Sequence, residues 1–451
     1  MGENLTVIGS GPGGYVAAVL ASKHGLEVRV VEKDVIGGVC TNRGCIPSKA
    51  LLSTAEKIET IKGARRDGIK AELKEVDFQK VMKKKDRAVK VSRKAIINLF
   101  EKHDIEVIEG EAELIDKSSV KVDDKVLKSD YIIIATGSKP ASLPHLEIDE
   151  ETVLSSKGAL YLDEVPDSML IVGGGYIGLE MAYIYSSMGS DVHIVELMDR
   201  LIPTMDRDLS KVAEKMMKRK RVNFYTGSKV SEIKNKDPIE AKIEGETEKV
   251  IEVEKVLSSV GRKPTPPESN IKLSNEEGFI DVNECMKTNY DNIYAVGDVT
   301  GKSMLAHSAF KQAEIAVNDI LCKETAAFDP SNVPAGIFTH PEIASVGLTE
   351  KEARDRISGV NVGKYPISAT GRGSSTGERM GLAKVIVDEE DIVVGLHLAC
   401  PGATDIVMEG AIAIEEKVKS EELGKVIHPH PTFSEAIKEA AENVTGESVH
   451  S

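Results

Sequence analysis

Two cysteines five positions apart carry the most reactive chemistry in the sequence. Cys40 and Cys45 are the only closely spaced pair among five cysteines in 451 residues, a number and a length that do not fit a disulfide scaffold. A zinc knuckle needs a second ligand pair, which the sequence lacks, so no metal site is predicted. Pro47 suits the first turn of a helix and would place Cys45 at the helix N-terminus, where the dipole favours a thiolate. We interpret the pair as a redox-active disulfide, with two buried free cysteines as the alternative.

A strand–turn–helix–strand pattern that occurs twice would position this chemistry. The first copy spans residues 5–32 and the second residues 169–196, each with three turn glycines and a final acid. In such a unit the glycines permit a tight turn, the helix N-terminus holds a pyrophosphate, and the acid binds a ribose hydroxyl. The residues are Gly9, Gly11, Gly14 and Glu32 in the first copy, and Gly173, Gly175, Gly178 and Glu196 in the second. Two complete copies predict two dinucleotide sites; the alternative is two glycine-rich turns without ligands.

Three further apolar segments predict buried strands at residues 131–134, 256–260 and 292–296. Each leads into a glycine, as expected at the ligand edge of a parallel sheet. Thr136, Gly137, Gly261 and Asp298 lie where these strands end, and the family resemblance described below implies that they bind the nucleotides.

The segment after the first copy resembles the redox motif of a known family. Residues 37–49 read Gly-Gly-Val-Cys-Thr-Asn-Arg-Gly-Cys-Ile-Pro-Ser-Lys, which resembles the redox motif of the flavoprotein pyridine nucleotide-disulfide oxidoreductases. The resemblance of the chain to this family runs nearly from end to end. The resemblance implies FAD in the first site, a nicotinamide nucleotide in the second, and a homodimer formed through the C-terminal domain.

The same resemblance assigns roles to individual residues. It implies that Cys40 exchanges with the substrate and that Cys45 faces the flavin. Lys49, four residues after Cys45, would reach the flavin ring and pair with Glu180, because an unpaired lysine there would be costly. Asp298 would hold the ribityl chain.

The resulting fold class is α/β, with two Rossmann-like dinucleotide-binding domains and a C-terminal α+β dimerisation domain. Between the strands, residues 78–102 predict a charged, solvated helix, and residues 264–267 predict a linker. The expected division is an FAD-binding first part, an NAD-binding domain, a central domain that completes the FAD site, and the dimerisation domain. Their bounds are residues 1–145, 146–265, 266–329 and 330–451.

Near the C-terminus, His430-Pro-Thr-x-Ser-Glu435 resembles the acid–base pair of the family, in which the histidine serves the other subunit. A histidine oriented by a carboxylate takes a proton from a dithiol and returns it later. The alternative is a surface loop with two spare histidines, and His428 fits that alternative better than His430.

The choice among family members depends on the second nucleotide site. The carboxylate of Glu196 would repel the 2′-phosphate of NADP, so NAD is favoured over NADP. The resemblance then implies oxidation of dihydrolipoamide to lipoamide; other disulfide or mercuric reductases of the family, or a non-catalytic NAD-binding regulator, are the alternatives. Two residues depart from the pattern: Arg43 places a charge beside the redox pair that would influence substrate choice, and Tyr176 resembles the gating tyrosine of glutathione reductases.

The net charge and the distribution of apolar residues limit the kinds of partner that the chain is expected to bind. The net charge of −15 argues against general binding to nucleic acid or to anionic lipid. No run of apolar residues is long enough for a transmembrane helix, and no secretory signal is visible, so a cytoplasmic location is expected. The implied partners are a second copy of the chain and the lipoyl groups of a 2-oxo acid dehydrogenase or glycine cleavage complex.

Overall fold

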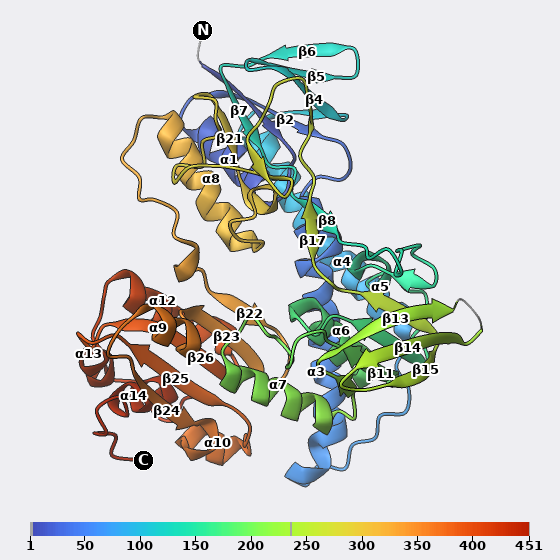
Figure 1. Ribbon diagram of the computed structural model, residues 1–451, viewed down its shortest axis with the longest axis vertical. Helices are drawn as coiled ribbons and strands as arrows, with labels where there is room; N and C mark the ends of the chain where they lie inside the picture. The colour runs from blue at the N-terminus through green and yellow to red at the C-terminus, as the bar shows by residue number, and fades with distance from the viewer. Residues whose placement is uncertain (1–2, 235–236, 451) are drawn as a thin grey trace. The chain divides into compact units, whose positions relative to one another are not determined.

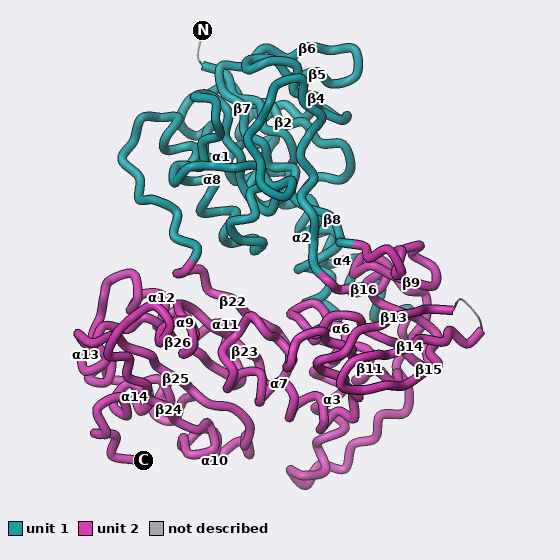
Figure 2. Tube along the Cα trace, in the orientation of Figure 1, with its two compact units in different colours: residues 1–51, 79–141, 261–330 teal, residues 52–78, 142–260, 331–451 magenta. Residues whose placement is uncertain are grey.

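The computed structural model describes residues 3–234 and 237–450, which fold as two compact units (Figures 1 and 2). The first unit comprises residues 1–51, 79–141 and 261–330, and the second comprises residues 52–78, 142–260 and 331–451. Each unit therefore combines segments that are far apart in the sequence. Within the described residues, no helix is both long and apolar enough to cross a membrane.

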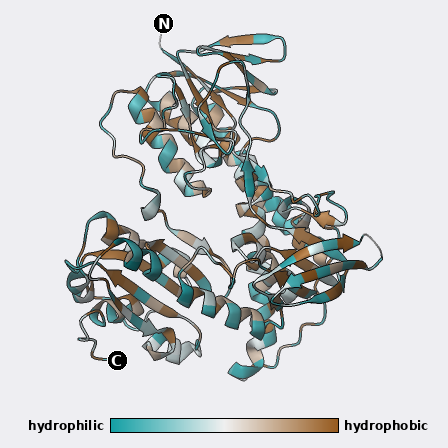
Figure 3. Cartoon of the chain, viewed as in Figure 1, coloured by the Kyte–Doolittle hydropathy of each residue, from teal (hydrophilic) through white to brown (hydrophobic). Residues whose placement is uncertain are grey.

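A parallel five-stranded sheet forms the centre of the first unit. Its order is β21-β7-β1-β2-β3, and every neighbouring pair is parallel. The strands are β1 (Asn4–Ile8), β2 (Glu27–Glu32), β3 (Glu106–Glu109), β7 (Tyr131–Ile134) and β21 (Ile293–Ala295). Strands buried on both faces read as continuous apolar runs, as β7 does with its sequence Tyr-Ile-Ile-Ile (Figure 3). The strands predicted at residues 131–134 and 292–296 are confirmed.

Two helices pack together beside this sheet, α1 (Pro12–Lys23) and α8 (Ala306–Ile320). Helix α1 begins with a proline in its first turn, a position where the missing N–H costs nothing. The unit also contains a four-stranded sheet in the order β18-β4-β5-β6. Its strands are β4 (Ala112–Asp116), β5 (Ser119–Val122), β6 (Lys125–Lys128) and β18 (Glu268–Ser269).

Three helices follow the first dinucleotide turn: α2 (Gly38–Arg43), α3 (Cys45–Gly63) and α4 (Phe78–Lys102). The helix predicted at residues 78–102 is confirmed. It is not solvated on all sides, because Met82, Val89 and Phe100 are buried beneath its charged face. The segment predicted as a linker begins instead in β17 (Arg262–Pro264), which pairs with β8 (Ser138–Pro140) as a two-stranded ribbon.

The second unit repeats the parallel sheet with the order β12-β11-β10-β16-β9. The strands are β9 (Val153–Leu154), β10 (Ser168–Val172), β11 (Asp191–Val195), β12 (Asn223–Tyr225) and β16 (Lys255–Ser258). Helices α6 (Tyr176–Met188) and α7 (Arg207–Arg219) contact it, and an antiparallel sheet of β13 (Ser228–Lys234), β14 (Ile239–Gly245) and β15 (Lys249–Val253) follows in the chain.

The C-terminal part of the second unit is an antiparallel sheet with helices, in the order β22-β23-β26-β25-β24. The strands are β22 (Ala335–Ile337), β23 (Glu342–Gly347), β24 (Asn361–Pro366), β25 (Leu382–Val387) and β26 (Val393–Cys400). The helices include α9 (Glu350–Arg356), α12 (Met408–Glu415), α13 (Ser420–Lys425) and α14 (Glu435–Glu442). This arrangement confirms the predicted α/β class with two Rossmann-like folds and a C-terminal α+β part.

A buried lysine joins helix α7 to the C-terminal sheet. Lys384 on β25 has only 2% of its side chain exposed, and its Nζ lies 2.7 Å from Asp206 Oδ1, 3.1 Å from Asp208 Oδ2 and 2.8 Å from Glu350 Oε2. Burial alone would raise the pKa of Asp208 and of Glu350, but hydrogen bonds from lysines, Lys384 among them, lower both. The same contacts, Asp206 first, raise the pKa of Lys384 against the effect of its burial.

Replacing Lys384 with methionine should lower the free energy of unfolding by about 3–5 kcal/mol, because buried carboxylates lose their cation. Since the carboxyl pKa values are lowered and the lysine pKa is raised, the contribution is present between about pH 5 and pH 10 and is lost as the pH falls below about 4. Denaturation followed by circular dichroism measures this loss of stability, because the chain has no tryptophan whose fluorescence could be followed.

Lys364 is the control, since it also contacts Asp208 but its side chain is 48% exposed, and Lys364→Met should cost less than about 1 kcal/mol. An equal loss for Lys384→Met at pH 3 and pH 7 would contradict this account.

Candidate functional site

The first dinucleotide turn leaves no room for side chains where the helix approaches the strand. A Cβ on Gly14 would lie 1.9 Å from the carbonyl oxygen of Gly9, and Gly9 itself has a φ of +98°. At Gly11, by contrast, no heavy atom of the described residues other than its chain neighbours lies within 4 Å of a Cβ position. The turn therefore packs tightly on its protein side and is open at the helix N-terminus, as a pyrophosphate requires.

Glu32, the acid that ends β2, is held by this turn. Its Oε2 accepts hydrogen bonds from Ser10 N at 2.8 Å and Ser10 Oγ at 2.6 Å, and its Oε1 accepts one from Asp34 N at 3.0 Å. The carboxylate is thus fixed at the end of the strand, where the sequence pattern predicts ribose binding.

Other residues of the first unit also fit a flavin nucleotide. Thr136 Oγ1 is buried and has no hydrogen-bond partner among the described residues, so it is a polar atom available to a ligand. Gly137 has a φ of +70° and open space at its Cβ position. Asp298 accepts a hydrogen bond from Ser138 Oγ, and Arg262 Nε donates to the same hydroxyl at 2.7 Å.

The second dinucleotide turn has the same construction. A Cβ on Gly178 would lie 2.0 Å from the carbonyl oxygen of Gly173, whereas Gly175 faces open space. Glu196 accepts hydrogen bonds from Gly174 N at 2.7 Å and Met198 N at 2.8 Å. Gly261, three residues after β16 ends at Ser258, belongs to the first unit, and it has a φ of +118° and open space at its Cβ position among the described residues.

Tyr176 is the first residue of α6, directly after the open glycine of the second turn. Burial of its phenol raises the pKa above the usual value, against the smaller effect of a hydrogen bond to Thr204. The hydroxyl therefore stays protonated.

The cysteine pair is a disulfide in the structure. Cys40 lies in α2, Cys45 is the first residue of α3, and their Cα atoms are 4.7 Å apart across the break at Gly44. The prediction that Pro47 places Cys45 at a helix N-terminus is confirmed. Among the described residues, no cluster of three or more His, Cys, Asp or Glu side chains forms a metal site.

Lys49 and Glu180 belong to different units, so their pairing stays a prediction. Lys49 lies in α3, four residues after Cys45. Glu180 is buried on α6, and its Oε1 accepts a hydrogen bond from Phe338 N at 3.2 Å.

The histidine–glutamate pair forms as predicted. His430 Nδ1 lies 2.7 Å from Glu435 Oε1, and Thr432 N donates to Glu435 Oε2 at 2.7 Å. Burial would raise the pKa of Glu435, but the Thr432 hydrogen bond and the His430 ring lower it overall. With Nδ1–H donated to a carboxylate, Nε2 is the atom that accepts a proton, and the side chain is 74% exposed.

The expectation that His428 fits a spare surface histidine better than His430 does was wrong. Its side chain is only 5% exposed; Nε2 lies 3.1 Å from Glu409 Oε2, and Nδ1 lies 2.9 Å from the carbonyl oxygen of Val426. The hydrogen bond to Glu409 raises the pKa of His428. This pair anchors the segment that leads to His430.

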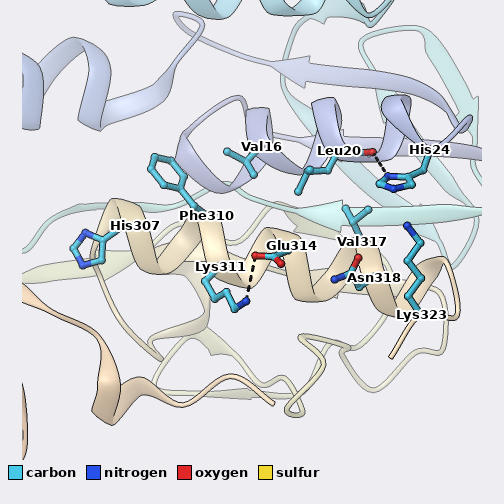
Figure 4. A pocket seen from close by; sticks show the side chains of 10 residues that line it. All are labelled: Val16, Leu20, His24, His307, Phe310, Lys311, Glu314, Val317, Asn318 and Lys323. Carbon is cyan, nitrogen blue, oxygen red and sulfur yellow. Dashed lines mark hydrogen bonds and ion pairs between the residues drawn. The ribbon is translucent and has the colours of Figure 1, made fainter. Parts of the chain in front are cut away.

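A groove of about 520 Å³ runs between α1 and α8 (Figure 4). His307 and Phe310 lie at one end, and His24 and Lys323 lie at the other. None of the residues predicted to bind a nucleotide or to react lines it. The groove is therefore separate from the chemistry described above.

Sequence reasoning missed the supporting residues Ser10, Asp34, Ser138 and Glu409. Ser10 and Ser138 are adjacent to predicted site residues, which is a weak signal for a supporting role. No pattern pointed to Glu409, because it is 19 positions from its histidine.

Two family models match the chain. The model described as pyridine nucleotide-disulphide oxidoreductase matches residues 3–313, and the model of the dimerisation domain of that family matches residues 333–441. A dihydrolipoyl dehydrogenase of Bacillus subtilis is 38% identical over 99% of this chain and 99% of its own length. Dihydrolipoyl dehydrogenase 2 of Haloarcula marismortui is 37% identical over 100% of this chain and 98% of its own.

Solved structures agree in fold. LpdA of Mycobacterium tuberculosis has a TM-score of 0.89 at 24% identity, with coverage of 98% of this chain and 99% of that one. The HOCl-induced flavoprotein disulfide reductase RclA of Escherichia coli has a TM-score of 0.85 at 26% identity, with coverage of 97% and 99%.

The position of Glu196 predicts discrimination between NAD and NADP. A carboxylate fixed by two backbone N–H groups opposes a 2′-phosphate, so NAD should be preferred by at least about tenfold in kcat/KM. Glu196→Gln should reduce this preference. Asp191→Asn is the control, because it removes the same charge from the other end of β11 and should leave the preference unchanged. Equal use of both nucleotides by the unaltered chain would overturn this account.

Proposed function

We propose that this chain, which belongs to the pyridine nucleotide-disulphide oxidoreductase family, is a dihydrolipoyl dehydrogenase. The observation that carries the proposal is the Cys40–Cys45 disulfide at the N-terminus of α3, in the same unit as the first dinucleotide turn. The proposed reaction oxidises dihydrolipoamide to lipoamide and reduces NAD⁺ to NADH.

The two cysteines have different roles in the proposed mechanism. A thiolate of dihydrolipoamide attacks Cys40 Sγ, which forms a mixed disulfide and releases Cys45 as a thiolate. The second substrate thiol then attacks the sulfur of the first, which closes lipoamide and releases Cys40. The N-terminal end of α3 stabilises the Cys45 thiolate, because the helix dipole is positive there. The two electrons lost by the substrate have thus reduced the Cys40–Cys45 disulfide to a dithiol.

The family uses FAD and NAD, and the residues described above fit both. When bound, FAD would supply a two-electron carrier between the dithiol and the nicotinamide. Glu32, Thr136 and Asp298 would hold the flavin nucleotide, with Lys49 beside its ring. The second turn, Glu196 and Tyr176 would hold NAD and control access to it.

His430 is the proposed acid–base group. Its Nε2 would take the proton of the incoming substrate thiol, while Glu435 orients the ring and stabilises the imidazolium. The dimerisation-domain match and the relatives indicate a homodimer. We place His430 of one subunit at the disulfide of the other.

The domain division follows the same reasoning. Residues 1–145 and 266–329 would form the FAD-binding part, residues 146–265 the NAD-binding domain, and residues 330–451 the dimerisation domain. The pairing of β21 with β7 supports the return of the chain to the first sheet after residue 265. The proposed location is the cytoplasm, and the proposed substrates are lipoyl groups of a 2-oxo acid dehydrogenase or glycine cleavage complex.

Steady-state assays test the substrate. The chain should reduce NAD⁺ with dihydrolipoamide and should not oxidise NADH with glutathione disulfide. Cys40→Ser should abolish lipoamide turnover yet retain bound flavin and a thiolate–flavin absorbance band, because Cys45 remains. Cys322→Ser, which alters an exposed free cysteine, is the control and should remain active. Normal turnover by Cys40→Ser would refute the assignment of the redox pair.

Mixed dimers test the shared site. Cys45→Ser and His430→Gln homodimers should each be nearly inactive, the latter by about 10²–10⁴-fold, which is typical for loss of acid–base catalysis. A heterodimer of the two variants would contain one complete site, so it should recover roughly half of the activity per dimer. Verified heterodimers without activity would mean that the site lies within one chain or that His430 is not the base.

A further inference from the structure

A cation lies within the loop that joins the redox cysteines, and a carboxylate from another turn pairs with it. Arg43 is the last residue of α2, three positions after Cys40 and two before Cys45. Its guanidinium contacts both carboxylate oxygens of Asp34, with Nη2 at 2.9 Å from Oδ1 and Nη1 bonded to Oδ2. The Arg43 side chain is 31% exposed and the Asp34 side chain 47%. The bidentate geometry makes this ion pair more specific than a single surface contact.

Asp34 belongs to the turn that also serves the first nucleotide site. Its backbone N–H donates to Glu32 Oε1 at 3.0 Å, and Gly37 N donates to Ser10 Oγ at 3.0 Å within the same turn. The carboxylate of Asp34 is therefore held in a fixed place relative to the disulfide loop.

A second set of contacts fixes α2 independently of this ion pair. Asn42 Nδ2 donates to the carbonyl oxygens of Ile36 at 3.0 Å and Gly38 at 2.8 Å, while Arg93 Nε donates to Asn42 Oδ1 at 2.8 Å. Asn42 is buried. Because these contacts hold the helix, a substitution at position 34 changes the charge beside the disulfide more than it changes the geometry.

The charge matters because reduction of the disulfide creates a thiolate. A cation between the two cysteines in the chain would stabilise that thiolate, and hence the reduced pair, if no carboxylate offset its charge. A disulfide whose reduced form is stabilised is a stronger oxidant, and it holds its electrons rather than passing them on. NAD⁺ is a weak electron acceptor. A dithiol that must deliver electrons to NAD⁺ therefore cannot have its reduced form strongly stabilised by a nearby positive charge.

We propose that Asp34 cancels the charge of Arg43 and so keeps the Cys40–Cys45 pair reducing enough to deliver electrons to NAD⁺. The inference rests on the proposed function. Asp34 and Arg43 act through the cysteines, so they are tuning residues and take no part in the bond changes. The electron count is unchanged: two electrons and two protons reduce the disulfide to the dithiol, which loses one proton as the thiolate forms.

The test follows the thiolate–flavin absorbance band during a pH titration of the holoenzyme reduced with dithionite. Asp34→Asn removes the negative charge that pairs with Arg43, so the midpoint pH of the band should fall by at least about 0.5 unit, a roughly threefold change in the thiolate ratio. Arg43→Gln removes the positive charge that pairs with Asp34, so the midpoint pH should rise. The double variant Asp34→Asn/Arg43→Gln carries neither charge and should return close to the unaltered value.

This pattern separates a charge effect from a structural one. If the pair served only to anchor α2, both single variants would shift the band in the same direction and the double variant would not restore it. Glu111→Gln is the matched control. Glu111 Oε1 lies 2.6 Å from Nζ of Lys33, the residue next to Asp34, so the variant also removes one carboxylate from an ion pair, but the partner of that carboxylate lies outside residues 40–45. This variant should leave the midpoint unchanged. The shifts should also shrink in 1 M salt, where charges are screened beyond about 3 Å.

A second readout is the direction of electron flow. In Asp34→Asn the rate of NAD⁺ reduction by dihydrolipoamide should fall, while the reverse rate with NADH and lipoamide should fall less. Dithionite reduction does not depend on the lipoyl substrate, so the two proposals fail separately. Absence of the band in the unaltered holoenzyme would overturn the proposed redox site, whereas a band that is present but unmoved by Asp34→Asn would overturn this inference alone.

Discussion

The close approach of a helix to a strand at two glycine turns is the constraint on which the rest of the structure depends. A Cβ at Gly14 or Gly178 would collide with the carbonyl oxygen of the first glycine of the same turn, at 1.9 Å and 2.0 Å. Only this approach leaves the helix N-terminus open at the sheet edge, where a phosphate is stabilised by backbone N–H groups. In both copies the acid at the end of the next strand then binds a backbone N–H of the turn, Ser10 for Glu32 and Gly174 for Glu196. The same local solution therefore occurs twice, and two nucleotide sites follow from it.

The disulfide is tied to the first of these turns by a short series of contacts. Ser10 Oγ donates to Glu32 and accepts from Gly37 N, so the turn fixes the chain immediately before α2. The break at Gly44 then allows α3 to begin at Cys45. A reactive sulfur at a helix N-terminus and a nucleotide turn are thus positioned by one small set of hydrogen bonds. Groups that must exchange electrons gain from such rigidity, since their separation is set by the fold and not by a flexible loop.

Sequence patterns predicted what is local, because spacing and residue type decide it. The turns, the acids, the strand at residues 131–134 and the helix start at Cys45 all depend on neighbours within one supersecondary unit. Contacts between distant segments were not predictable in this way. Nothing in the sequence pointed to Lys384, which lies among apolar residues in β25. The three carboxylates that surround it come from Asp206 and Asp208 at the start of α7 and from Glu350 in α9. His428 was misjudged for the same reason, since its partner Glu409 lies on α12, 19 positions earlier in the chain.

The surroundings of His430 bear on the proposal that a second subunit completes its site. A general base needs to lie within hydrogen-bond reach of the proton that it takes, and an imidazole that is 74% exposed has water as its neighbour. The segment before it exposes apolar side chains, with Val426 at 52% and Ile427 at 94%, and α12 exposes Ile412 at 59%. Exposed apolar groups of this kind mark an interaction surface. In the homodimer indicated by the dimerisation domain, covering this surface would remove water from the His430–Glu435 pair, which strengthens the hydrogen bond between them. Dimerisation and activation of the base would then be one event, because the same short segment carries both the apolar contacts and the histidine.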